Sequence, residues 1–132
     1  MKDPNNPCIF CSIRKNELIF ENNLAYASKD SYPVTKLHSL VVPKRCIKNY
    51  FELNDKEILA CDDLIKKLQQ KITSEDSTVK GFNVGTNSGK VAGQSIFHCH
   101  IHVIPRRVGD VENPQGGVRS VIPSKQHYIR KK

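Results

Sequence analysis

The chain has 132 residues, of which 38% are hydrophobic and 26% charged, as in an ordinary globular protein. This length fits one domain over residues 1–132 with a single core, and the chain contains neither a membrane-length apolar stretch nor a secretory signal. The net charge of +8 favours an anionic partner, but we do not expect nucleic acid, because recognition-helix and zinc-finger patterns are missing. We therefore expect a cytoplasmic protein that does not bind membranes.

Five short segments have the composition of β-strands. The first two are expected to form a hairpin, because Asn22-Asn23 between them tolerates positive φ. The third strand is expected to stop at Pro43 and the fifth at Pro105, because proline cannot donate to a strand ladder. The predicted strands are residues 18–21, 24–27, 37–42, 80–86 and 95–104.

One long helix is expected between the third and fourth strands. Asn54 or Asp55 can serve as its N-cap, with Glu57 in the capping-box position, and the helix should end near Ser74. Its apolar residues recur at steps of three and four. Together with the strands, this predicts an α+β fold with an antiparallel sheet, followed by an extended arm over residues 106–132. The residues of the apolar face are Ile58, Cys61, Ile65, Leu68 and Ile72.

The N-terminal region contains a C-x-x-C pair, Cys8 and Cys11. The chain has five cysteines, so a complete set of disulfides is impossible. In a reducing compartment, a C-x-x-C pair indicates metal or redox chemistry more than a structural disulfide.

Three histidines alternate within the fifth predicted strand. Side chains in a strand alternate between its two faces, so His98, His100 and His102 should share one face, opposite an unbroken apolar face. Three histidines that alternate on one face of a strand are not typical of a surface without a binding or catalytic role. Two functions remain open: a catalytic zinc site with three protein ligands, or a nucleophilic histidine flanked by imidazoles.

A glycine-containing turn over residues 87–95 precedes the histidines. Glycines such as Gly93 let backbone N–H groups approach an anion, and Gln94 and Ser95 add side-chain donors. The segment from Gly85 to Lys90 is one residue too short for a Walker A loop, and Val91 stands where serine or threonine is needed. The turn therefore indicates an anion site of another kind.

The combination of these motifs resembles the histidine-triad family. The matching segments are residues 81–87, Ala92-Gly93-Gln94-Ser95, the run from His98 to Arg106, Cys8-Ile9-Phe10-Cys11, Asp30 and the run from His38 to Lys44. The resemblance implies a five-stranded antiparallel sheet with one long helix and a short N-terminal helix, assembled as a homodimer. Pro105-Arg106 followed by Gly109-Asp110 is more similar to the dinucleoside polyphosphate hydrolases of the family than to its phosphoramidases.

The resemblance also implies an activity, nucleotidyl transfer or hydrolysis at the α-phosphate. His100 is expected to attack the phosphorus and form a nucleotidyl-histidine, which water then hydrolyses; neutral imidazole is a good nucleophile near pH 7. His98 and His102 complete the catalytic triad. Ser28 stands where many members carry an aromatic residue, which puts purine selectivity in doubt. The expected substrate-binding residues are Ile9, Phe10, Asp30, His38, Asn87, Gly93, Gln94, Ser95 and His102, with Ile13 also beside the base.

A subset of the family holds a structural zinc, and the resemblance implies such a site here. Its ligands are expected to be Cys8, Cys11, Cys46 and His98, with Cys46 in place of the histidine found in that subset. Three cysteines and one histidine are an accepted tetrahedral zinc set, and because they close the coordination sphere the zinc is structural. Three alternatives stay open: a nucleoside phosphoramidase, a nucleotide-binding module with little turnover, and zinc hydrolysis through the three histidines.

Overall fold

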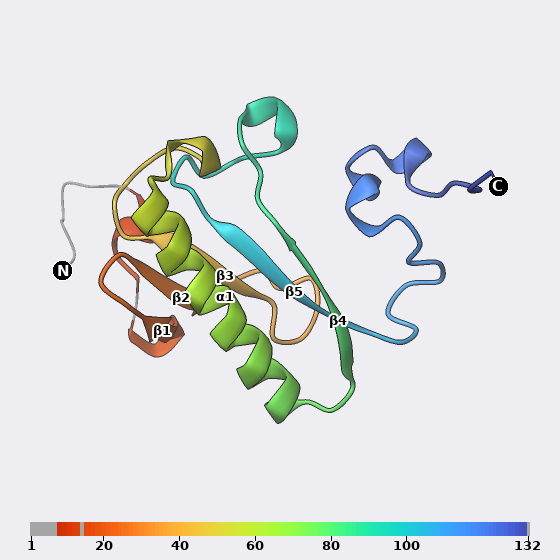
Figure 1. The fold of residues 1–132 in the computed structure, drawn as a ribbon, viewed down its shortest axis with the longest axis horizontal. Helices are drawn as coiled ribbons and strands as arrows, with labels where there is room; N and C mark the ends of the chain where they lie inside the picture. Colours follow the sequence, from red (N-terminus) through yellow and green to blue (C-terminus); the bar gives the residue numbers. More distant parts are fainter. Residues whose placement is uncertain (1–7, 14, 132) are drawn as a thin grey trace.

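The computed structural model describes residues 8–13 and 15–131 and shows the predicted α+β architecture (Figure 1). Five antiparallel strands form one sheet in the order β1-β2-β3-β5-β4, and a single α-helix, α1, crosses one face of it. Met1 is the first residue of the predicted domain, and Lys132 is the last residue of both the predicted domain and the predicted arm. Both lie outside the described residues. The elements are β1 (Leu18–Glu21), β2 (Ala25–Lys29), β3 (Ser39–Pro43), α1 (Asp55–Glu75), β4 (Val79–Gly85) and β5 (Ile101–Arg107).

The helix begins and ends as its sequence predicts. Asn54 accepts a hydrogen bond from the backbone of Glu57, whose carboxylate accepts one from the backbone N–H of Asn54, so the capping box is complete. The apolar side of α1 packs on the sheet, and the main core lies between the two. The fully buried members of this core include Ala25, Ala27, Val41, Leu64, Leu68 and Val103.

The other face of the sheet is covered in part by the N-terminal segment, whose 3-10 helix η1 (Ile9–Cys11) is the predicted short helix. Phe10 packs with Tyr26, Leu40 and Val42, and the Tyr26 hydroxyl donates to the Phe10 carbonyl at 2.6 Å. Because Tyr26 and Leu40 alternate with residues that face α1, β2 and β3 are buried on both sides. The histidine-bearing face of β5 therefore continues into this second, smaller core.

The predicted start of the fifth strand at residue 95 is wrong, because β5 begins only at Ile101. Before that point the backbone N–H of Cys99 donates to Ile47, in the loop after β3, and the Thr86 hydroxyl donates to the His100 carbonyl. His98 and His100 therefore lie in an irregular segment that the two neighbouring loops hold in place. Only His102 belongs to a regular ladder, opposite Leu40 and Gly85.

One proline prediction also differs from the structure. β3 ends at Pro43 as predicted, whereas β5 continues past Pro105 to Arg107. The pairing of β5 with β3 reaches only Val103, so at Pro105 the strand has β4 as its one neighbour and proline is tolerated as on an edge strand. Leu37, predicted as the start of the third strand, has a φ of 75°, which breaks the strand and delays β3 to Ser39.

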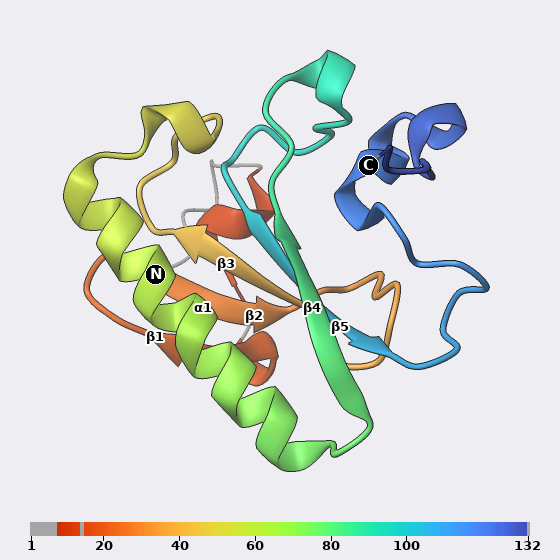
Figure 2. The same cartoon turned by 45° about the vertical axis from the view of Figure 1, so that its right-hand side comes forward.

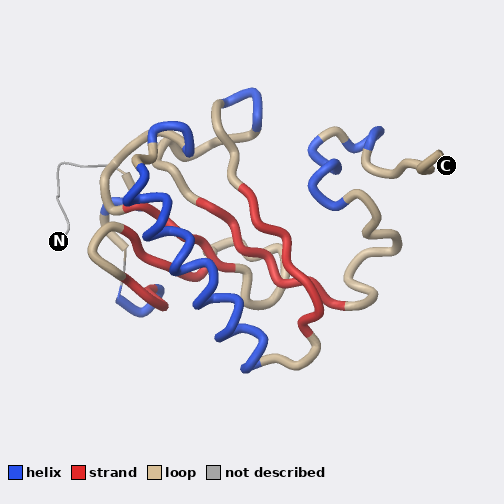
Figure 3. The backbone as a smooth tube through the Cα atoms, in the orientation of Figure 1, coloured by secondary structure: helices blue, strands red, loops and turns tan. Residues whose placement is uncertain are grey.

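The chain after β5 leaves the sheet on the side of β4 and carries two 3-10 helices, η5 (Gly117–Val121) and η6 (Pro123–Lys125) (Figures 1 and 2). We call residues 108–131 the arm. The backbone view shows α1 and the arm lying apart in space, with β4 between them (Figure 3). Within the described ranges, we find no helix with the length and apolar character needed to span a membrane.

Candidate active site

His100 lies where the irregular segment enters β5, against the N-terminal segment. Its ring is 4.8 Å from the ring of Phe10 and 5.4 Å from that of His102, measured between centroids. Its Nδ1 is 2.8 Å from the carbonyl oxygen of His98. A carbonyl can only accept, so Nδ1 of the neutral ring carries the proton and the lone pair is on Nε2. This is the tautomer that a nucleophilic histidine needs.

His102 takes its tautomer from His38. The backbone N–H of Val34 donates to His38 Nδ1 at 3.1 Å, so the neutral His38 ring carries its proton on Nε2. That Nε2 is 2.9 Å from His102 Nδ1 and 3.2 Å from a carboxylate oxygen of Asp30. His102 Nδ1 therefore accepts, and His102 keeps its proton on Nε2, where it can donate to an anion.

Burial lowers the pKa of both His38 and His102 below the usual value of 6.5. The loss of solvation is the main cause for each ring, and the nearby charge of Asp30 opposes it. His100 and His38 lower the pKa of His102 further. Both imidazoles are therefore neutral at pH 7, as the hydrogen-bond chain from Val34 requires.

His98 is fully buried and points to the cysteines of the N-terminal segment. Its Nε2 donates to the Pro43 carbonyl at 2.7 Å, so its Nδ1 carries the lone pair. That nitrogen is 3.3 Å from the sulfur of Cys8 and 3.5 Å from that of Cys11. The ligand atoms of Cys8, Cys11, Cys46 and His98 all lie within 4.8 Å of one another.

The residues around His98 fit a zinc ion. Bonds of about 2.0 Å to nitrogen and 2.3 Å to sulfur in a tetrahedron place ligand atoms roughly 3.5 Å apart, close to the distances from His98 to Cys8 and Cys11. A backbone carbonyl on the far nitrogen is the usual outer partner of a zinc-bound histidine. Within the described ranges, the three triad histidines do not converge as one ligand set, which disfavours catalytic zinc held by the triad.

A cavity of about 680 Å³ opens beside His100 and His102, and we call it the nucleotide pocket after the substrate class that the sequence resemblance implies. Apolar side chains form one wall, and Asp30, Asn87, Gly93 and Ser95 supply polar groups near the histidines. The structure thus brings together most of the predicted substrate-binding residues. The apolar residues of the pocket are Ile9, Phe10, Ile13, Leu40 and Ile96.

Two predicted site residues lie elsewhere. Gln94 is buried, and its amide nitrogen donates to the carbonyls of Lys48 and Ile96 while its oxygen accepts from Gly89. Both N–H groups of the amide are used in this way, so this arrangement does not support a phosphate contact. His38 is buried behind His102 and does not line the nucleotide pocket.

Several functional groups could not be found from residue types. The Val34 N–H and the Pro43 and His98 carbonyls, which set the three tautomers, are backbone groups and leave no mark in the sequence. Ile96 and Leu40 have the apolar character of core residues in any reading. Ser28 is 1% exposed beside the pocket, and its hydroxyl has no hydrogen-bond partner among the described residues.

Comparison with known proteins places most of the chain in one family. The HIT domain family matches residues 13–109. An adenosine 5'-monophosphoramidase of Schizosaccharomyces pombe is 35% identical over 75% of this chain and 74% of its own. An adenylylsulfatase of Arabidopsis thaliana is 36% identical over 80% of this chain, which spans 55% of that protein. The crystal structure of a zinc-bound histidine triad protein from Mycobacterium smegmatis superposes with a TM-score of 0.72, at 28% identity over 81% of this chain and 80% of that one.

Proposed function

We infer from the membership of this chain in the histidine-triad (HIT domain) family, a family of nucleotide-binding hydrolases and transferases, that it hydrolyses nucleotides at the α-phosphate through His100. One observation carries this proposal: the hydrogen bond from His100 Nδ1 to the His98 carbonyl leaves the Nε2 lone pair for the substrate. The ring stands in the wall of the nucleotide pocket, so a phosphorus atom bound there is within its reach.

The reaction proceeds in two displacements. His100 Nε2 attacks the α-phosphorus, the nitrogen–phosphorus bond forms, and the bond to the leaving group breaks with its electron pair going to that group. The His100 ring becomes positively charged. The hydrogen bond from its Nδ1–H to the His98 carbonyl strengthens as this charge develops. A water molecule then attacks the phosphorus, the bond to Nε2 breaks, the ring returns to neutral, and the water proton passes to solvent.

The residues around His100 stabilise the charge on the phosphate. His102, held as an Nε2–H donor by His38, can donate to a phosphate oxygen, and the Ser95 hydroxyl and the backbone at Gly93 add donors from the turn. Asp30 stands at the same pocket and can accept from ribose hydroxyls. Ile9, Phe10 and Ile13 form the apolar wall expected for a base.

We also propose that Cys8, Cys11, Cys46 and His98 bind a structural zinc ion. The His98 tautomer and the spacing of the ligand atoms support it, as does the zinc-bound relative. When bound, such an ion cross-links the N-terminal segment, the loop after β3 and the segment that carries His100. His98 then has a positioning role, because the carbonyl that holds His100 is its own.

The finer substrate class remains a proposal. The predicted preference for dinucleoside polyphosphates rests on Pro105-Arg106 and Gly109-Asp110, whereas the named relatives are a phosphoramidase and an adenylylsulfatase. Their names support a nucleoside monophosphate joined at its phosphate to a leaving group. The homodimer and the cytoplasmic location likewise remain predictions.

The test is chemical trapping of the intermediate. Protein incubated with adenosine 5'-phosphoramidate and quenched with base should carry an adenylyl group on His100, detected by mass spectrometry of the digest. His100→Ala should lose the adduct and lower kcat by at least about a thousandfold. His127→Ala, an exposed histidine away from the nucleotide pocket, is the matched control. Wild-type turnover in His100→Ala would overturn the proposal.

A further inference from the structure

The loop between β2 and β3, residues 30–38, carries the backbone N–H that fixes the tautomer of His38. Val34 donates this N–H to His38 Nδ1 at 3.1 Å, and His38 in turn fixes His102. Residues 31–34 are exposed, and Val34 itself is 69% exposed. Packing therefore does little to hold this part of the loop, and its position depends on hydrogen bonds made by the residues that follow.

The 30–38 loop continues past the end of the β3–β5 ladder. The last pair of that ladder is Ser39 with Val103. The same antiparallel register, continued by four residues, would place Thr35 opposite Arg107. Leu37 prevents this continuation, because its φ of 75° turns the chain out of the extended conformation. Side chains therefore have to make the connection to β5 that the backbone ladder does not make.

Two side chains make this connection. The Thr35 hydroxyl donates to the Pro105 carbonyl at 2.8 Å, and Arg107 donates to the Lys36 carbonyl at 2.9 Å. The Lys36 carbonyl belongs to the peptide bond that enters Leu37. A left-handed conformation is unfavourable for leucine and persists only where the surrounding structure enforces it. Arg107 supplies such a contact at the peptide bond next to the strained residue.

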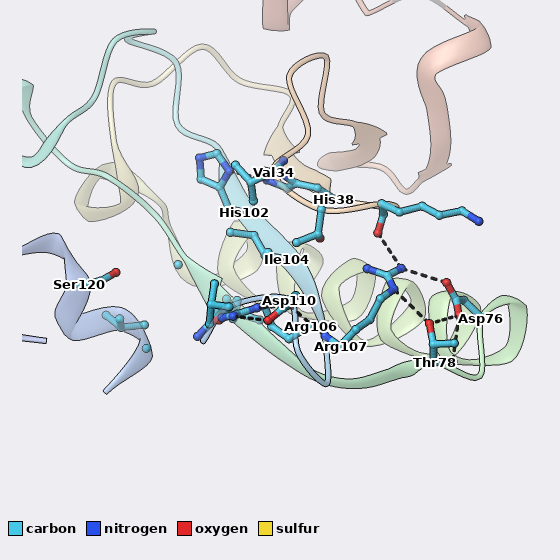
Figure 4. Close-up of a pocket in the computed structure, with 18 of the residues that line it drawn as sticks. Val34, His38, Asp76, Thr78, His102, Ile104, Arg106, Arg107, Asp110 and Ser120 are labelled. Atoms are coloured by element: carbon cyan, nitrogen blue, oxygen red, sulfur yellow. Dashed lines mark hydrogen bonds and ion pairs between the residues drawn. The ribbon is translucent and has the colours of Figure 1, made fainter. Parts of the chain in front are cut away.

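Arg107 is itself held in place at the end of α1. Its Nη2 also donates to a carboxylate oxygen of Asp76 at 3.0 Å, and its Nε donates to the Thr78 hydroxyl at 3.2 Å (Figure 4). The side chains of Arg107 and Asp76 are only 18% and 16% exposed. Hydrogen bonds from Thr78 and the nearby Arg107 hold the pKa of Asp76 at about 2, so this carboxylate is charged at neutral pH. The guanidinium is therefore a fixed donor for the Lys36 carbonyl.

The adjacent Arg106 has nearly the same exposure, 23% against 18%, but it binds other partners. It makes two hydrogen bonds of 2.8 Å to Asp110 of the arm and one of 2.7 Å to Asn83 of β4. Both arginines line one cavity of about 1170 Å³ (Figure 4). Among the side-chain hydrogen bonds of the described residues, only Arg107 of the two reaches the 30–38 loop. Arg106 is thus a matched control for the role of Arg107.

We propose that Arg107 is a positioning residue for the reaction at His100, because it holds the 30–38 loop in the conformation that fixes the tautomers of His38 and His102. The inference rests on the proposed function, in which His102 donates from Nε2 to the phosphate. Arg107 does not line the nucleotide pocket, so its effect reaches the substrate only through the loop.

Loss of the guanidinium removes the contact that opposes relaxation of Leu37. When φ of Leu37 returns to the negative values that leucine prefers, the chain before it moves, and the Val34 N–H leaves His38 Nδ1. His38 can then carry its proton on either nitrogen, and in one of these two forms it has no proton to donate to His102 Nδ1. His102 is then no longer held as an Nε2–H donor for the phosphate.

The test reads the tautomers directly and without substrate. In the full chain with ¹⁵N-labelled histidine at neutral pH, long-range ¹H–¹⁵N spectra distinguish the protonated from the unprotonated nitrogen of each ring. The wild type should show a protonated Nε2 and an unprotonated Nδ1 in both His38 and His102. Arg107→Met should move the His38 shifts toward the average of the two tautomers, whereas Arg106→Met should keep the wild-type shifts. Arg107→Lys keeps one donor for the Lys36 carbonyl and should fall between.

The kinetic effect should follow the tautomers. With adenosine 5'-phosphoramidate, Arg107→Met should lower kcat about threefold to tenfold with KM little changed, as expected for one lost hydrogen bond that orients a donor. Arg107→Lys should recover part of this loss, and Arg106→Met should leave kcat unchanged. Thermal unfolding shows whether each variant is folded. Arg107→Lys, which keeps the charge that pairs with Asp76, provides the same comparison with Arg106→Met where Arg107→Met is unstable.

The spectra also separate this inference from the proposed function. Wild-type shifts in folded Arg107→Met and Arg107→Lys, or equal changes in the Arg106 and Arg107 variants, would overturn the inference whatever the turnover. Altered His38 shifts in the Arg107 variants alone, in a protein whose wild type has no turnover, would overturn the proposed function and leave the hold of Arg107 on the 30–38 loop supported.

Discussion

His98 and His102 are four residues apart with the same side chain, yet they lie in opposite chemical settings. His98 uses Nε2 for a backbone carbonyl and turns its Nδ1 lone pair to two sulfurs. His102 uses Nδ1 to accept from His38 and keeps the Nε2 proton for the nucleotide pocket. The difference is which ring nitrogen each neighbour occupies. It teaches that hydrogen bonds alone can leave different ring nitrogens available in identical residues. On this basis our proposal assigns His98 to the metal and His102 to the phosphate.

The largest effect is expected from removing a ligand of the proposed zinc site around His98. Cys46→Ser should abolish zinc binding, measured as metal content after desalting. Because a ligand present at a thousand times its Kd stabilises the folded state by about 4 kcal/mol, Tm should fall by about 10 °C or more. Cys46→His keeps a ligand at this position and should retain the metal. Cys61→Ala should lose core packing but still bind the metal. A full zinc content in Cys46→Ser would remove Cys46 from the site.

Substitution of His102 should lower turnover and leave the metal bound. His102→Leu removes the Nε2–H donor and should lower kcat by about a hundredfold or more, since lost donors to a developing anion cost roughly this much. Its zinc content and Tm should stay close to wild type. If His102→Leu loses zinc while keeping its activity, the division of labour between the two histidines is wrong.

Substitution of His38 tests the hydrogen-bond chain from Val34 through His38 that fixes the tautomer of His102. His38→Leu removes the group that donates to His102 Nδ1, so His102 is free to take the wrong tautomer, and kcat should fall about tenfold with KM little changed. His38→Gln keeps an N–H near the same place and should recover part of the loss. Identical rates for the two variants would show that His38 acts only by filling space.

The pH dependence should follow the lowered pKa values of His38 and His102. Both rings are neutral at pH 7, and both gain protons as the pH falls below 6.5 through the lowered values. A proton on His102 Nδ1 then faces the Nε2–H of His38, and the chain breaks. We expect kcat/KM to be constant near neutral pH and to fall only below about 6.5. A fall that already begins above this pH would contradict the neutral assignment.

The smallest effect is expected at Ser28, the buried hydroxyl without a described partner. Unlike the two histidines, it has no hydrogen-bond partner within the described ranges that would define its role. Ser28→Ala should raise the free energy of unfolding by about 1 kcal/mol, because an unsatisfied buried polar group is removed. Chemical denaturation measures this directly. A loss of stability would show that the hydroxyl is satisfied in solution.

Much of this organisation follows from the sequence. The capping box at Asn54 and Glu57, the spacing of the apolar residues in α1 and the five apolar runs were enough to predict the α+β fold. These are local signals, because a cap and a helical face depend on residues three or four apart. The alternation of the histidines also predicted a shared functional region, although only His102 lies in the strand.

What the tertiary structure decided are the contacts between distant backbone groups. The Pro43 carbonyl accepts from His98, and the Val34 N–H donates to His38 and fixes its tautomer. The Ile47 carbonyl accepts from the backbone N–H of Cys99, which therefore lies outside the strand ladder. Backbone N–H and carbonyl groups are the same in every residue type except proline, so no sequence pattern distinguishes the ones that act. The placement of the arm over β4 and β5 is likewise a long-range outcome. Residue types alone therefore predicted three histidines at one place, and the fold gives each ring its own hydrogen-bond partners.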